Sequence, residues 1–163
     1  MEYKYLLELL RGGLYEQFSE TMRQAAIPFL DPAVYGRSTL ENSSFLVSSV
    51  NPEEALHGRG YVARLSGSTA EFMSIWQIMM FGRKPFLRTE SGVQINLQPC
   101  IPAYLIDEER TIRAAFMENS TVIYHFAECR DYFPGSYSIR IRSMVDVDAI
   151  RQGAATETVA DIF

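Results

Sequence analysis

The sequence has few of the residues that hold disulfide-rich domains or metal sites together. It contains 2 cysteines and 2 histidines in 163 residues. Neither histidine has a cysteine, a second histidine or a carboxylate at a metal-ligand spacing, so we expect no metal site. Cys100 lies in a Pro-Cys-Ile-Pro segment with bulky apolar neighbours. We therefore expect free thiols, with Cys100 buried, and no disulfide framework.

Excess positive charge and long apolar runs are absent as well. Fifteen Lys and Arg stand against 20 Asp and Glu, and the basic residues are scattered, which excludes the cationic face that nucleic-acid binding needs. The longest apolar stretch, Ala70–Gly82, contains polar residues and is too short to cross a bilayer. Residues 1–11 are charged and amphipathic, unlike a secretory signal. We expect a cytoplasmic protein without nucleic-acid or membrane partners.

Apolar residues are plentiful enough for a core. The sequence is 47% hydrophobic and 21% charged, with 7 prolines and 10 glycines, which excludes a disordered or low-complexity chain. A chain of this length buries roughly 70% of the surface that its unfolded form exposes. The sequence is therefore typical of a globular protein.

The apolar pattern changes character near residue 85. Before it, apolar residues recur at helical spacing, with one helix ending at Gly12 and Gly13 and a second over about 15–26. After it, short segments predict strands at 93–97 and 137–142 and a hairpin of 111–117 with 121–126. We therefore predict an α+β fold with a helical segment over 1–84 and a small antiparallel β-domain over 85–163.

Residues 28–67 show little periodicity, and we expect a long loop there, of the kind that is usually functional or covered by another part of the structure. Its His57-Gly58-Arg59-Gly60 segment has two interpretations. His57 and Arg59 could contact a sugar or phosphate, or the glycines could only let the chain turn. Glu41, Glu53 and Glu54 form no opposed carboxylate pair, and His125 is expected to be an ordinary strand residue.

The strongest local signal is the segment Ser66-Gly67-Ser68-Thr69. Ser68 and Glu71 fit a capping box, which predicts a helix over 69–81 that Gly82 ends. This helix is apolar around almost its whole circumference, so we expect Trp76 and its methionines in the core. Free N–H groups and the helix dipole favour an anion such as phosphate at this start. An ordinary N-cap fits the same residues.

Two motifs resemble the C-terminal part of glycoside hydrolase family 94, which contains cellobiose and chitobiose phosphorylases. They are the run from Arg64 to Phe72 and the segment Gly92–Pro102, which ends in Pro-Cys-Ile-Pro. The resemblance covers roughly residues 40–145. This chain has Ser66 where the family has threonine, and Ser68 resembles an extra residue.

The resemblance implies that the helical segment is the end of an (α/α)6 barrel and that the β-domain is sandwich-like. It implies reversible, inverting phosphorolysis of a β-glycosidic bond in a longer parent enzyme, with inorganic phosphate as co-substrate and no metal or organic cofactor. The phosphate-binding role falls on Ser66 and Gly67, with Ser68 and Thr69 as neighbours. The general-acid aspartate of the family has no counterpart here, so we expect the chain alone to be inactive.

We therefore expect the C-terminal part of a glycoside phosphorylase-like enzyme, with an oligosaccharide, phosphate and the rest of the parent chain as partners. The alternative is a non-catalytic carbohydrate-binding or assembly module. A dimerisation element is a third interpretation, because an incomplete barrel leaves apolar helix faces exposed and could form a homo-oligomer.

Overall fold

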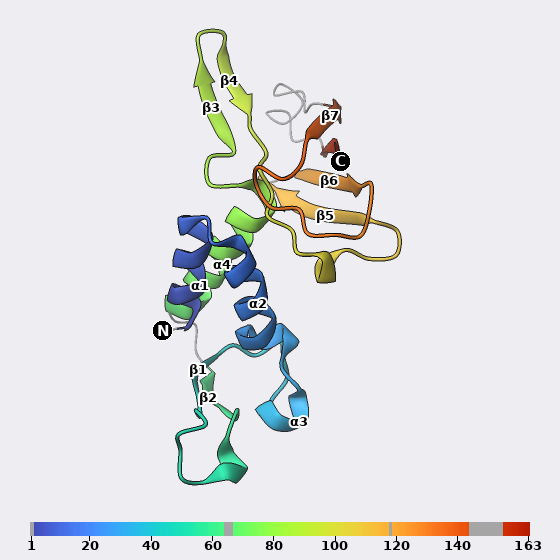
Figure 1. Cartoon of the computed structure of the whole chain (residues 1–163). Helices are drawn as coiled ribbons and strands as arrows, with labels where there is room; N and C mark the ends of the chain where they lie inside the picture. The colour runs from blue at the N-terminus through green and yellow to red at the C-terminus, as the bar shows by residue number, and fades with distance from the viewer. Residues whose placement is uncertain (1, 64–66, 118, 144–154) are drawn as a thin grey trace. The chain divides into compact units, whose positions relative to one another are not determined.

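The chain has an α+β fold in a computed structural model that describes residues 2–63, 67–117, 119–143 and 155–163 (Figure 1). It divides into two compact units, Met1–Ile78 and Met79–Phe163. We call them the helical unit and the sheet unit and describe each by itself. The barrel-end and β-sandwich identities, and the predicted boundary after residue 84, stay predictions.

The helical unit is built from amphipathic helices and a small hairpin. Its elements are α1 (Glu2–Gly12), α2 (Tyr15–Ala25), α3 (Pro32–Tyr35), β1 (Ser43–Leu46), β2 (Gly60–Ala63) and the first part of α4 (Gly67–Phe81), with single 3-10 turns at Ile27–Phe29 and Glu54–Leu56.

The two predicted N-terminal helices are confirmed. Gly13, with φ 76°, separates α1 from α2 in the left-handed conformation that glycine adopts without strain. Leu6 and Leu10 of α1 and Phe18 of α2 are at most 1% exposed, so the apolar faces of both helices are buried. The Tyr3 ring lies 5.5 Å from that of Phe72, which links α1 to α4.

The long loop predicted over residues 28–67 was wrong in part, because β1 and β2 pair there as an antiparallel hairpin. In the register, Ser43 faces Ala63 and Phe45 faces Tyr61. The strands are short, and Phe45 is 65% exposed while Ser43 is buried. Since the buried position is polar and the exposed one apolar, the usual alternation that marks a strand is reversed.

The α4 helix differs from its prediction at its start and on one face. It begins at Gly67, so Ser68 lies inside the helix and not at its cap. Met73 is 67% and Trp76 43% exposed, whereas Ile75 is buried. The prediction that Trp76 and all the methionines form core was therefore wrong. An apolar residue at every helical position does not show which side other elements cover.

The sheet unit contains a hairpin and one four-stranded sheet within its described residues. The hairpin strands are β3 (Phe86–Thr89) and β4 (Gly92–Ile95), and the sheet strands are β5 (Thr111–Phe116), β6 (Ser120–Phe126), β7 (Ile139–Ser143) and β8 (Thr156–Ile162), with a 3-10 turn at Ala103–Leu105.

The sheet order is β5-β6-β8-β7, which confirms the predicted hairpin of β5 and β6. The expectation of a purely antiparallel domain was wrong, because β6 and β8 pair in parallel from Ser120 with Thr156 to Phe126 with Ile162. The sequence interpretation also missed β8 altogether. A parallel pair needs a long crossover, so no local turn signal announces it.

The core of the sheet unit joins β6 to the end of α4. The Tyr124 hydroxyl donates to the Met80 carbonyl at 2.6 Å, and the Cys100 N–H donates to the Met79 carbonyl at 2.7 Å. Gly82, with φ 86°, ends α4 as predicted. No helix among the described residues is both long and apolar enough to cross a membrane.

Candidate functional site

The predicted anion-binding turn lies at the start of α4, and the structure describes only part of it. Ser66 lies outside the described residues, and Gly67 and Ser68 are the first two residues of the helix. The Asn42 side chain donates to Thr69 Oγ1 at 3.2 Å. This contact fastens the first turn of α4 to the residue that precedes β1.

A cavity of about 340 Å³ borders this contact. Its lining residues come from α1, from the end of α2 and the turn after it, and from the segment Asn42–Leu46. One of the α1 residues is Glu2, and its carboxylate repels an anion. This cavity therefore does not by itself complete a phosphate site beside Thr69.

His57 and Arg59 point to different surroundings. His57 Nε2 lies 2.7 Å from the Asn51 carbonyl, so this nitrogen carries the proton and donates within its own loop. Arg59 instead lines a second cavity of about 470 Å³, to which His57 does not contribute. The structure thus brings Arg59, but not His57, together with other polar side chains.

This second cavity, which we call the arginine cavity, is lined by Tyr35, Gly36, Arg37, Glu41, Arg59, Gly60 and Tyr61. Two sequence triplets of mirrored order, Tyr-Gly-Arg at 35–37 and Arg-Gly-Tyr at 59–61, provide six of the seven residues. The first triplet begins at the last residue of α3, and the second begins one residue before β2.

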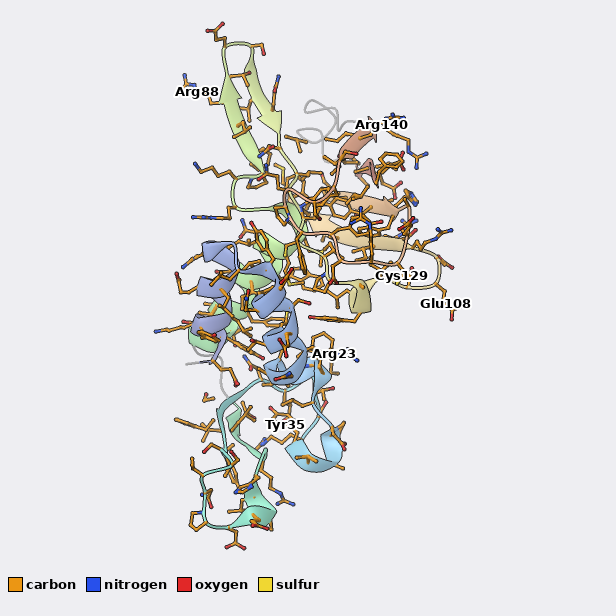
Figure 2. All side chains as sticks on the ribbon, in the orientation of Figure 1. Arg23, Tyr35, Arg88, Glu108, Cys129 and Arg140 are labelled. Carbon is orange, nitrogen blue, oxygen red and sulfur yellow. The ribbon has the colours of Figure 1, made fainter. Side chains whose placement is uncertain are left out.

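Tyr35 fixes the geometry of the arginine cavity. It is 1% exposed and is the last residue of α3 (Figure 2). Its hydroxyl lies 2.6 Å from both the Glu41 carbonyl and Ser43 Oγ and accepts from the Ser43 N–H at 3.1 Å. These bonds satisfy a buried polar group and tie the last residue of α3 to the start of β1.

Two glycines let the backbone approach this tyrosine. Gly36 has φ 71° and caps α3 in the left-handed conformation. A Cβ atom on Gly60 would lie 2.6 Å from Ser43 Oγ and 2.8 Å from Tyr35 Cζ, so no side chain fits there. Val62 follows with φ 58°, a conformation that is an outlier for a β-branched residue.

The two arginines of the cavity differ in their partners. Arg37 donates from Nη1 to Glu41 Oε2 at 3.0 Å and from Nε to the Gly60 carbonyl at 2.9 Å. Within the part of the chain that the structure describes, the Arg59 guanidinium has no hydrogen bond or ion pair. The lining therefore carries one cation that no carboxylate neutralises.

Sequence reasoning singled out Arg59 but missed Arg37, Tyr35 and Tyr61. The mirrored triplets were the available signal. Their meaning depends on the pairing of β1 with β2, which the sequence interpretation did not anticipate.

The other polar candidates have structural partners. Glu71 lies 3.7 Å from Lys4 Nζ, and His125 Nδ1 lies 3.2 Å from Thr111 Oγ1 on the neighbouring strand. Cys100 is a buried free thiol, as predicted, and burial raises its pKa to about 12. Among the described residues, no group of three His, Cys, Asp or Glu side chains could hold a metal ion.

No model of a known protein family matches this sequence, and a search of curated proteins gave no match. The resemblance to glycoside hydrolase family 94 thus depends on the two motifs at residues 64–72 and 92–102.

Proposed function

We propose that this chain is the C-terminal part of a glycoside phosphorylase-like enzyme of the cytoplasm, and that residues 66–69 hold inorganic phosphate in that enzyme. In the parent reaction, a phosphate oxygen attacks the anomeric carbon and the glycosidic C–O bond breaks. The departing oxygen takes a proton from a general acid, which the parent supplies elsewhere. The products are a sugar 1-phosphate of inverted configuration and the shortened saccharide.

The observation that carries the proposal is that α4 joins the two motifs of the resemblance. Residues 67–69 form the start of α4, and the Pro-Cys-Ile-Pro segment is bonded to the other end of this helix through the Cys100 N–H and the Met79 carbonyl. Two segments about thirty residues apart thus lie at the two ends of the same helix. This arrangement supports the proposal that both motifs come from one family.

The chemistry of the turn supports a phosphate. In the first turn of a 15-residue helix, the leading backbone N–H groups have no partner within the helix, and the dipole places partial positive charge beside them. The bond from Asn42 to Thr69 Oγ1 holds this turn in place and makes the threonine hydroxyl an acceptor there, so its own proton is available to donate.

The exposed face of α4 supports an origin in a larger protein. Met73 and Trp76 are 67% and 43% exposed, although both are large apolar side chains. We propose that this face packs against preceding helices of the parent barrel, or against a second copy of the chain. The sheet unit would then be the sandwich-like terminal domain of the family.

The test is phosphorolysis by a longer enzyme that carries this sequence, with β-linked disaccharides and phosphate as substrates. The Ser66→Ala/Gly67→Ala variant should raise KM for phosphate at least tenfold, about 1.4 kcal/mol, while KM for the disaccharide changes little. Ser74→Ala is the matched control, because Ser74 lies on α4 and, among the residues that the structure describes, its hydroxyl bonds only the Ala70 carbonyl of its own helix.

Two results would overturn the proposal. An unchanged KM for phosphate, together with altered retention on a polysaccharide, would instead favour a carbohydrate-binding module. Release of sugar 1-phosphate by the 163-residue chain alone would contradict the dependence on a general acid from elsewhere.

A further inference from the structure

We propose that the arginine cavity binds the phosphoryl group of a small hydroxylated phosphate monoester, with Arg59 as its main ligand. This site uses residues other than the turn at 66–69 and does not depend on the phosphorylase proposal. Its evidence is the convergence of two arginines, a carboxylate and two tyrosines on one cavity of about 470 Å³.

Charge favours an anion in this cavity. The lining contains Arg37, Arg59 and Glu41, and the ion pair of Arg37 with Glu41 accounts for one positive and one negative charge. Arg59 remains with a full positive charge and no described partner. An arginine guanidinium presents its N–H groups in a planar fork that matches a phosphate or carboxylate in a bidentate arrangement.

Arg37 is held ready as a second donor. Its bonds to Glu41 Oε2 and the Gly60 carbonyl use two of the five N–H groups of a guanidinium, which leaves three for a ligand. Because these bonds already fix the side chain, a ligand loses less side-chain entropy when it binds here than at a mobile arginine.

Gly36 lies beside the Arg59 side chain. A Cβ atom on Gly36 would stand 3.8 Å from Arg59 Nε, at ordinary van der Waals distance, so the guanidinium lies close to the backbone after α3. The buried Tyr35 hydroxyl is bonded to the Glu41 carbonyl and the Ser43 N–H, and these bonds hold this side of the cavity in place. The cavity is therefore formed before a ligand arrives.

The size and the remaining lining identify the ligand class. The cavity is several times larger than an inorganic phosphate, which leaves room for the group that the phosphate esterifies. Tyr61 is 42% exposed and offers an aromatic face to C–H groups, and Glu41 can accept bonds from hydroxyls. A phosphorylated sugar has both the anion and the hydroxyls.

The test is titration of the 163-residue chain with glucose 1-phosphate, followed by calorimetry or NMR. Glucose and inorganic phosphate serve as the two partial probes. We expect glucose 1-phosphate to bind at least tenfold more tightly than either. Arg59→Ala should weaken the binding of glucose 1-phosphate at least tenfold. Arg59→Lys should have an affinity between those of Arg59→Ala and the unaltered chain, because the lysine ammonium keeps the charge but lacks the planar pair of N–H donors.

Arg88→Ala is the matched control. Arg88 is exposed, projects from the β3–β4 hairpin and lies in the other unit (Figure 2). The Arg88→Ala variant should bind glucose 1-phosphate with the affinity of the unaltered chain. Circular dichroism of each variant separates a lost ligand contact from a lost fold.

Four outcomes would overturn the proposal. Unchanged binding by Arg59→Ala would remove the site. Equal affinity for glucose would show a neutral sugar site, and equal affinity for inorganic phosphate would refute the monoester class. If Ser66→Ala/Gly67→Ala loses binding and Arg59→Ala does not, the phosphate lies at the turn, which supports the proposed function and contradicts this inference.

Discussion

The substitution Gly60→Ala tests whether the contact between β2 and Tyr35 builds the helical unit. The new Cβ atom would stand 2.6 Å from Ser43 Oγ and 2.8 Å from Tyr35 Cζ, where ordinary contacts need about 3.4 Å or more. Neither neighbour is a flexible side-chain end, because Tyr35 is 1% exposed and Ser43 is 7% exposed. Tyr35 Cε2 is closer still, so the tyrosine ring must move by about an ångström or more.

The energetic cost has two parts of opposite sign. Overpacking costs about 1–3 kcal/mol, and displacing the Tyr35 hydroxyl from its partners costs about 1 kcal/mol more. Alanine in place of glycine lowers the entropy of the unfolded chain and returns about 0.4–1 kcal/mol. We expect a net loss of about 2 kcal/mol in the free energy of unfolding, within a range of about 1–3.6 kcal/mol, which is a large share of the stability of a small domain.

Urea unfolding followed by tryptophan fluorescence measures this loss, because Trp76, the single tryptophan of the sequence, lies in the helical unit. The urea midpoint should fall by about 1 M or more. Gly12→Ala is the control, since nothing lies within 4 Å of the added atom, and it should change the midpoint little.

A double-mutant cycle identifies the cause. If the clash with Tyr35 is responsible, Tyr35→Ala should cost less in the Gly60→Ala background than in the unaltered chain. Stability of Gly60→Ala within about 0.5 kcal/mol of the unaltered chain would refute the reasoning, because no strain of that size would then exist.

Two further predictions concern the sheet unit. A thiol reagent at neutral pH should label Cys129, which is exposed, and leave Cys100 unlabelled until urea is added. Burial raises the pKa of Cys100 from 9.0 to about 12 in the folded chain, so only the unfolded chain ionises between pH 8 and 10, and the free energy of unfolding should fall by roughly 1–1.5 kcal/mol over that range. The Cys100→Ala variant should lack this pH-dependent fall. The Gly82→Ala variant places a Cβ atom 2.9 Å from Gln98 Cβ at φ 86°, whereas a Cβ atom on Gly135, at φ 96°, has nothing within 4 Å. Gly82→Ala should therefore lower the thermal midpoint of this unit more than Gly135→Ala does. Equal effects would count against the contact with Gln98.

Local patterns in the sequence were enough to predict part of this fold. The apolar spacing of α1 and α2, the glycines at 13 and 82, and the hairpin of β5 and β6 are all decided by neighbouring residues, and the structure confirms them. Each depends on contacts within a few residues or across one tight turn.

The strand β8 could not be predicted in this way. Its buried positions are Thr158, Ala160 and Ile162, so only one of three carries a strong apolar signal. Its partner β6 lies about thirty residues earlier and pairs in parallel, which leaves no turn motif to connect them. The burial of β8 depends on the sheet around it and not on its own composition.

The arginine cavity was hidden for the same reason. Residues 35–37 and 59–61 meet because Tyr35 bonds Ser43 and because Gly60 pairs with Leu46 across the hairpin. Neither contact leaves a mark in the periodicity of the sequence. The start of α4, by contrast, could be predicted near Ser68, because its signal is contained in a few consecutive residues.

Under the proposed ligand binding, folding of the hairpin and occupation of the arginine cavity are therefore coupled equilibria. Arg59 precedes β2 directly, and the position of β2 depends on the packing of Gly60 against Tyr35. A ligand that binds only the folded form at one hundred times its dissociation constant adds about 2.7 kcal/mol of stability. That gain is close to the loss expected for Gly60→Ala. A phosphate monoester that occupies the cavity should thus stabilise the unaltered chain against urea, and the Arg59→Ala variant should lose this protection while keeping its own midpoint.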